Sequence, residues 1–171
     1  MRVPCARCGV EHDLGDLEPS YRRPDPVHAI AMPDRPARVR ESKDFCALWG
    51  RADEAHRWFV RVLVPFRVHG GAGRCSWGLW VEVSKATFDE ISELWDDARQ
   101  AEHGPWPATL ANDAATYPPT MGLRGSVRFA DPNEIPHFDP DSSQDHPFVT
   151  EWVAGVPRAR VVEWQLCFAH A

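Results

Sequence analysis

The first third of the chain contains four side chains whose types and spacing suit a zinc ion. Cys5 and Cys8 are separated by two residues and followed by a glycine, so a tight turn can bring both thiolates to one point. His12 lies four residues after Cys8, and Cys46 completes a tetrahedral set of three thiolates and one imidazole. Four protein ligands leave no position for an activated water, so the pattern predicts a structural zinc, with His28 as the reserve fourth ligand.

Two other interpretations of these cysteines stay open. A redox CxxC pair needs a preceding strand and a helix that starts at the motif, and the first eight residues predict neither. Unliganded cysteines would leave residues 1–50, which are rich in proline, turns and charge, with little to hold them. The remaining Cys75 and Cys167 lie in strand-like sequence without basic neighbours, and we expect them to be small core residues.

The elements that must position these residues predict an α+β fold with an antiparallel sheet. Apolar residues alternate over residues 57–68 and again over 76–84, and the glycine-rich stretch between them suits a hairpin connection. Apolar residues at helical intervals follow, with Ser84 or Thr87 as the cap, and predict an amphipathic helix over about 86–103. A central hairpin packed against one main helix is therefore the expected core.

The rest of the chain predicts shorter elements within a single domain, residues 1–171, made of a metal-stapled segment (1–50) and an α+β core (51–171). Pro147 suits the first turn of a short helix that ends near Gly155. Residues 158–168 suit either a closing strand or a second short helix, and the β-branched and aromatic content favours the strand. The other expected strands are 109–111, 122–129 and 135–138.

Composition and charge limit the classes of partner. The 171 residues carry a formal charge of -6, so no large basic field is available for nucleic acid. The most basic stretch, Arg35 to Lys43, is interrupted by Pro36 and Glu41 and is predicted to be a solvated connection, although a peptide-size acidic partner remains open. No apolar run is long enough to cross a bilayer or to form the core of a signal peptide, so we expect a cytoplasmic protein that binds no membrane.

Several motifs, taken in order, resemble a bacterial family named only as domain of unknown function 2199. The resemblance covers nearly the whole chain and implies a small soluble bacterial protein with a metal knuckle and no assigned reaction. The motifs are Cys5-x-x-Cys8-Gly9-x-x-His12, Asp44-x-Cys46, Trp58-Phe59-Val60-Arg61, Trp77-Gly78-x-Trp80-Val81, Asn112, Tyr117-Pro118-x-Thr120-x-Gly122-Leu123, Asp145-His146-Pro147 and His170.

The resemblance also singles out residues that could form a ligand pocket. His146 is the natural acid or base, and Tyr117, Asn112 and Thr120 can donate hydrogen bonds that orient a ligand. The residues expected to contact the ligand are Trp77, Trp80 and Arg61. The alternative is purely structural: the tryptophans are core or half-buried, Tyr117 and Asn112 belong to turns, and His146 caps a helix.

Two hypotheses about function follow. The first is a non-enzymatic binding protein, similar in role to an immunity or regulatory protein, whose acidic surface and exposed sheet aromatics meet another protein. The second is a small enzyme with a pocket around His146, Tyr117 and Asn112, floored by Trp80. Signatures of serine hydrolases, zinc proteases, P-loops and dinucleotide-binding proteins are absent from the sequence, and a small-molecule ligand stays open.

Overall fold

A computed structural model of the chain describes residues 2–4, 11–13, 18–70, 73–131 and 133–168. Within these ranges the fold is α+β, as predicted. The strands are β1 (Arg2–Pro4), β2 (Glu11–Asp13), β3 (Val39–Glu41), β4 (Phe45–Leu48), β5 (Arg57–Arg67), β6 (Arg74–Val83), β7 (Trp106–Leu110), β8 (Arg124–Arg128) and β9 (His137–Pro140). The helices are α1 (Asp25–His28), η1 (Met32–Asp34), α2 (Arg35–Arg38), α3 (Lys85–Leu94), η2 (Gln100–Glu102), α4 (Pro147–Ala154) and α5 (Arg158–Phe168).

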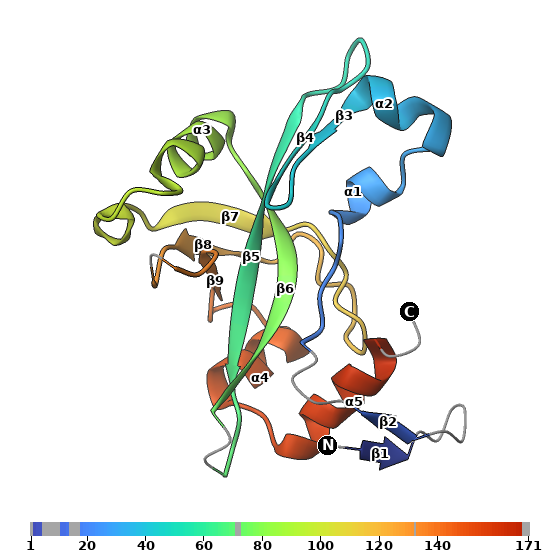
Figure 1. Cartoon of the computed structure of the whole chain (residues 1–171), viewed down its shortest axis with the longest axis vertical. Helices are drawn as coiled ribbons and strands as arrows, with labels where there is room; N and C mark the ends of the chain where they lie inside the picture. The colour runs from blue at the N-terminus through green and yellow to red at the C-terminus, as the bar shows by residue number, and fades with distance from the viewer. Residues whose placement is uncertain (1, 5–10, 14–17, 71–72, 132, 169–171) are drawn as a thin grey trace.

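The larger sheet has the strand order β3-β4-β5-β6-β7-β8-β9 and closes into a barrel. Closure occurs because β5 also pairs with β9, in parallel, where Leu63 lies opposite His137. The N-terminal half of β5 instead pairs with β4, so β3 and β4 extend away from the ring. In Figure 1, β3 and β4 lie with α1 and α2 at one end of the long hairpin, and α4, α5 and the β1–β2 hairpin lie at the other.

The hairpin β5–β6 confirms the predicted antiparallel pair. Its register runs from Trp58 opposite Val83 to Arg67 opposite Arg74. The alternating apolar residues of β5 are fully buried inside the barrel, where they join β6, β7, β8 and the two C-terminal helices in one core. Burying this apolar surface is the main source of stability for such a fold.

A second, smaller apolar cluster lies outside the barrel core. It consists of Val27, Cys46, Leu48, Phe59, Trp80 and Ala111. Alternate residues of a strand point to opposite faces, so Phe59 enters this cluster while Val60 enters the barrel core. The sheet is therefore buried on both faces near β4 and β5, and the outer cover is the segment that contains α1.

The main helix is shorter than predicted. Ser84 caps α3 by accepting a hydrogen bond from the Thr87 N–H at 3.1 Å, as one of the two expected caps. The helix ends at Leu94 instead of near residue 103. The reason is local, because the Asp97 carboxylate accepts a hydrogen bond from the Arg99 N–H at 2.7 Å and so favours a turn over another helical turn.

The C-terminal elements confirm one prediction and overturn another. Helix α4 begins at Pro147, and Gly155, with φ at 82°, ends it in a conformation that glycine adopts readily. Residues 158–168, for which we favoured a strand, form helix α5. Val161 and Trp164 lie three residues apart on one helical face, and both are buried in the barrel core. Tertiary packing here outweighs the β propensity of the segment.

Residues 18–50 are held by the sheet itself. The Tyr21 N–H donates to the Gly78 carbonyl and the Gly78 N–H donates to the Pro19 carbonyl, both at 2.8 Å, so this segment runs alongside β6. A Cβ at Gly78 would lie 2.6 Å from Ser20 Oγ, so only glycine allows this approach. The described part of the N-terminal third therefore has attachments that do not depend on a metal, contrary to the expectation that it needs a staple.

Candidate functional site

Asn112 lies at a buried junction between the end of β7, β6 and the segment that enters α1. Its Oδ1 accepts a hydrogen bond from the Trp80 N–H at 2.9 Å, and its Nδ2 donates to the Arg23 carbonyl and Asp25 Oδ1, both at 2.8 Å. The side chain is fully buried, and its oxygen and both amide hydrogens have partners. These bonds commit Asn112 to holding residues 23–25 against the sheet.

Thr120 and Trp80 extend the same junction. Thr120 Oγ1 accepts a hydrogen bond from the Ala114 N–H at 2.7 Å and donates one to the Asn112 carbonyl at 2.8 Å, which ties the loop after β7 to itself. The Trp80 indole N–H donates to the Tyr21 carbonyl at 3.0 Å. The structure thus brings three predicted site residues together, but they line none of the cavities described below.

Tyr117 points toward the C-terminal helices and away from that junction. Its hydroxyl donates to the Glu151 carboxylate, which also accepts a hydrogen bond from Arg160 Nε at 3.1 Å. The Arg160 guanidinium lies over the Tyr117 ring, 4.8 Å from its centroid. Burial, and then the neighbouring Glu151, raise the pKa of Tyr117 far above its usual value. A phenol held neutral and fully engaged in this way ties α4 and α5 to the barrel.

His146 has the role of a helix cap. Its Nδ1 accepts a hydrogen bond from the Phe148 N–H at 3.1 Å, at the N-terminus of α4. A neutral imidazole that accepts at Nδ1 carries its proton on Nε2, and this atom is buried without a hydrogen-bond partner. His146 lines none of the cavities that we describe, so the geometry offers it no bound group to protonate.

The two tryptophans predicted to contact a ligand are core residues. Trp77 is fully buried in the barrel, with ring centroids 5.5 Å from Trp164 and 6.2 Å from Tyr117. Trp80 is nearly as buried in the outer cluster. The expectation that exposed aromatics of the sheet form a docking face is therefore wrong for both residues, because the helices and residues 18–21 cover them.

The predicted zinc ligands lie in separate parts of the molecule, and two of them lie outside the described residues. Those two, Cys5 and Cys8, belong to the segment that joins β1 to β2, and His12 lies in β2 opposite Val3. Cys46 is 1 % exposed in the outer apolar cluster, on a strand that Figure 1 places at the other end of the molecule from β1 and β2. Within the described ranges, no three His, Cys, Asp or Glu side chains gather closely enough to hold a metal.

Of the predicted site residues, Arg61 is the one that lines a cavity. This cavity, which we name the Arg61 cavity, has a volume of about 460 Å³. Four elements contribute to it: residues 20–22 beside β6, the end of β3, the β3–β4 turn and β5. Its lining residues are Ser20, Tyr21, Arg22, Glu41, Ser42, Lys43 and Arg61.

The Arg61 cavity has more positive charge than its own carboxylates neutralise. Arg61 Nη2 donates to Ser20 Oγ at 3.1 Å, and its Nη1 lies 3.6 Å from Asp44 Oδ1, a distance too long for a hydrogen bond. Arg22 and Lys43 are exposed and, among the described residues, make no hydrogen bond or ion pair. Two cations are therefore free to bind an anionic group from outside the chain.

A second cavity of about 430 Å³, the Met32 cavity, adjoins the first because Arg22 and Glu41 line both. Glu41 accepts two hydrogen bonds from Arg23, at 2.7 and 2.5 Å, and these bonds hold the pKa of Glu41 below its usual value. The other lining residues are Met32, Arg35, Pro36 and Val39. We call the two cavities together the cationic groove; Glu41 is the single carboxylate among its lining residues.

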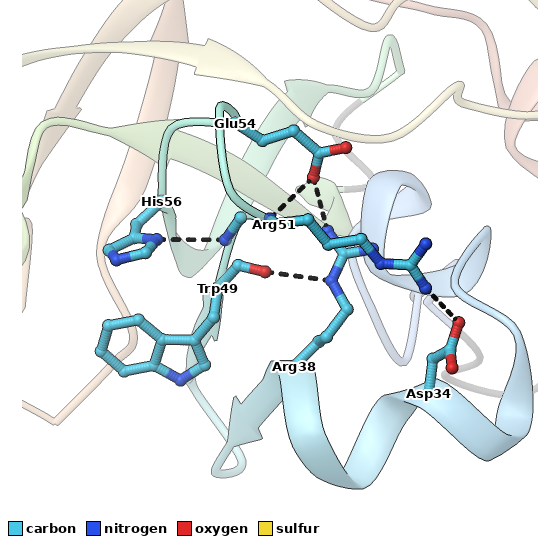
Figure 2. A network of polar contacts seen from close by, with 7 residues as sticks. Asp34, Arg38, Trp49, Arg51, Glu54 and His56 are labelled. Atoms are coloured by element: carbon cyan, nitrogen blue, oxygen red, sulfur yellow. Dashed lines mark hydrogen bonds and ion pairs between the residues drawn. The ribbon is translucent and has the colours of Figure 1, made fainter.

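A third cavity, of about 560 Å³, has a different charge arrangement. We name it the ion-paired cavity; its lining includes two arginines and two glutamates. Arg38 Nη2 donates to Glu54 at 2.7 Å, and Arg57 binds Glu82 through two hydrogen bonds of 2.8 and 2.6 Å. Figure 2 shows the Glu54 carboxylate between the Arg38 guanidinium and the backbone N–H of Arg51. The guanidinium groups of this cavity already have carboxylate partners.

Part of the cationic groove was visible in the sequence. The basic stretch from Arg35 to Lys43, predicted to be a solvated connection, supplies most of one wall. Arg22, Arg23 and Arg61 come from elsewhere in the chain. Their arrival depends on the close passage of residues 18–21 over Gly78, which no local pattern predicts.

The fold and the groove define an α+β protein with a closed barrel and a cationic surface cavity. A family model matches residues 4–156, so the chain belongs to the family described as uncharacterized protein conserved in bacteria (DUF2199). This confirms the resemblance seen in the sequence, and α5 lies beyond the matched residues. No curated protein and no solved structure matches the chain. None of the helices in the described residues is long and apolar enough to cross a membrane.

Proposed function

We propose that this protein is a non-enzymatic binding protein and that its cationic groove takes an acidic segment of a partner protein. The observation that carries the proposal is the pair Arg22 and Lys43, which are exposed at the Arg61 cavity without an ion pair among the described residues. The chain as a whole has a formal charge of -6, so this local excess of positive charge runs against the overall balance. Such a patch steers and orients an anionic partner.

A protein segment fits the groove better than nucleic acid. Single-stranded nucleic acid is usually bound by exposed aromatic rings that stack on bases. The one aromatic residue of the groove is Tyr21, whose ring is engaged with Phe168 at 5.4 Å and Trp77 at 6.5 Å. Its hydroxyl is also occupied, because it donates to the Asp113 carbonyl and accepts from the Ala115 N–H. The groove therefore offers charge without a stacking platform.

The arrangement of the other candidate residues supports binding over catalysis. Acid–base chemistry needs a titratable side chain within reach of a bound group. His146 caps a helix, the Tyr117 hydroxyl is bound to Glu151, and Asn112 has all of its hydrogen bonds within the chain. Their hydrogen bonds serve the fold, so the enzyme hypothesis draws no support from their geometry.

The binding proposal can be tested by fluorescence anisotropy with a labelled hexaglutamate peptide. We expect the Arg22→Glu/Lys43→Glu variant to bind about tenfold more weakly than the unmodified protein at low salt. The matched control is Arg74→Glu/Arg99→Glu, which makes the same charge change at two exposed arginines outside the groove. Raising the salt concentration should weaken binding to the unmodified protein and leave less difference between it and the groove variant.

Two outcomes would overturn the proposal. Equal losses in the groove variant and the control would show that only the net charge matters. Tighter binding of a single-stranded oligonucleotide of the same charge than of hexaglutamate would indicate a nucleic-acid partner instead.

We also propose that the β1–β2 segment binds a structural zinc ion through Cys5, Cys8 and His12. Support comes from the pairing of Pro4 with Glu11, which brings the two ends of the connecting residues 5–10 together. Cys46 stays a prediction as the fourth ligand, and its burial in the outer cluster does not favour it. Elemental analysis should find stoichiometric zinc in the purified protein and none in a Cys5→Ser/Cys8→Ser variant; equal zinc contents would contradict the proposal.

A further inference from the structure

The Met32 cavity contains the most exposed large apolar side chain among the described residues. Met32 is 70 % exposed, compared with 55 % for Val153 and 49 % for Met121. It lies in η1, and the cavity that it lines also has Pro36 and Val39 in its wall. Methionine is flexible and polarizable, and it is common at surfaces that adapt to a partner. An apolar side chain thus lies beside the cations of the groove.

We propose that the two cavities form one docking groove for a partner segment in which a large apolar residue lies next to carboxylates. This inference rests on the proposed function and specifies the partner. The carboxylates contact Arg22, Lys43 and Arg61 in the Arg61 cavity, and the apolar side chain packs on Met32 in the Met32 cavity. Charge complementarity identifies the occupant, since the groove's lining residues include five cations and one carboxylate.

The anchored cations give the groove a fixed shape. Arg35 donates to the Ile30 carbonyl at 2.9 Å and to the His28 carbonyl at 2.7 Å, which holds its guanidinium over the end of α1. Arg23 is fixed by its two hydrogen bonds to Glu41. A preformed wall lowers the entropy lost on binding. The free Arg22 and Lys43 then supply attraction, and the fixed arginines set the width between the two cavities.

The partner docks through its side chains and not as an added strand. Strand β3 is the edge of the seven-stranded sheet, and a free edge can pair with an extended peptide. Here the Val39 N–H donates to the Arg35 carbonyl, and the Val39 carbonyl accepts from Arg40 Nη1 at 3.0 Å. Local contacts thus occupy these backbone groups of β3, and the groove beside the strand remains for side chains.

The test compares three labelled peptides of equal length by fluorescence anisotropy. The first alternates glutamate with leucine, the second replaces each leucine with serine, and the third replaces each glutamate with glutamine. On the unmodified protein, we expect the leucine-containing acidic peptide to bind about fivefold more tightly than its serine counterpart, because its apolar side chains are buried in the Met32 cavity. The glutamine peptide should bind the most weakly of the three.

The variant Met32→Ser should remove the advantage of leucine over serine, and Met121→Ser, a methionine exposed elsewhere, should retain it. Both side chains are exposed, so each variant is expected to fold, and urea unfolding verifies this. Equal affinities of the leucine and serine peptides for the unmodified protein would overturn the inference and leave the proposed function intact. No binding of either acidic peptide would instead overturn the proposed function.

Discussion

The junction around Asn112 and the cationic groove lie next to each other, and both contain Arg23, yet they use polar groups in opposite ways. At the junction, the amide of Asn112 is buried and each of its hydrogen-bonding groups has a partner in the chain. In the groove, Arg22 and Lys43 are exposed and have no ion pair among the described residues. The residues that look most like a site in the sequence are structural, and those that look like a solvated connection are available to a partner.

The difference teaches that satisfaction of polar groups separates structural from binding residues better than residue type does. Leaving a buried polar group unpaired costs free energy, so a folded chain pairs it internally. An exposed cation costs little when it is unpaired, because water solvates it. Substitutions at the junction should therefore change stability, and substitutions in the groove should change binding.

The largest effect is expected for Asn112→Ala. The substitution leaves the Trp80 N–H, the Arg23 carbonyl and Asp25 without their partner. We expect the free energy of unfolding to fall by roughly 3 kcal/mol or more, measured by urea denaturation. Asn133→Ala is the control, since Asn133 is exposed and bonds only to the nearby Asp131. A loss below about 1 kcal/mol for Asn112→Ala would break the comparison.

Tyr117→Phe should cost less, about 1–2 kcal/mol at neutral pH, because it removes one hydrogen bond to Glu151. It should also change the alkaline limb of stability. Burial raises the pKa of folded Tyr117 above the ordinary 10.0, so the unfolded chain loses this proton first and stability falls as the pH rises past about 10.

Urea unfolding at a series of pH values measures this limb. The decline at alkaline pH should be less steep for Tyr117→Phe than for the unmodified protein, which isolates Tyr117 from Tyr21, whose pKa is also raised, to about 12. Identical slopes for the two proteins would show that the folded Tyr117 hydroxyl is not held neutral.

His146→Ala should cost about 1 kcal/mol, the usual value for the loss of a helix cap. His146→Asn should restore most of this stability, because asparagine is a favourable capping residue. Thermal or urea unfolding measures both. A variant in which asparagine fails to restore stability would argue that the imidazole has a role beyond capping α4.

The smallest effect on stability is expected for Arg22→Glu/Lys43→Glu. Both side chains are exposed and unpaired among the described residues, so the free energy of unfolding should change by no more than about 0.5 kcal/mol. If this variant instead unfolded as readily as Asn112→Ala, the groove would belong to the structural core of the molecule and the comparison would fail.

Local patterns predicted the elements of the fold that depend on local patterns. The alternation in β5 and β6 and the Pro147 start of α4 were sufficient to place the hairpin and that helix. Closure of the barrel was not predictable, because it depends on the contact of Leu63 with His137 from distant parts of the chain. Helix α5 was missed because its β-branched and aromatic residues suit a strand until the core that buries Trp164 is known.

The candidate site was harder to predict for a related reason. Asn112 and Trp80 were selected correctly as neighbours of a special position, but the sequence does not show that their partners lie inside the chain. For the groove, the basic stretch and Arg61 were visible, and the missing part was residues 20–23. Their place depends on the single glycine at position 78, which allows a backbone segment to cross a strand.

The most direct test of the account is to map where an acidic peptide binds by nuclear magnetic resonance. The unmodified protein, labelled with ¹⁵N and with ¹³C at its methionine methyl groups, is titrated with the alternating glutamate–leucine peptide. The account predicts that the Met32 methyl signal and the amide signals of Arg22, Lys43 and Arg61 shift, and that the Met121 methyl signal does not. Shifts centred on His146 and Tyr117, with an unchanged Met32 signal, would contradict it.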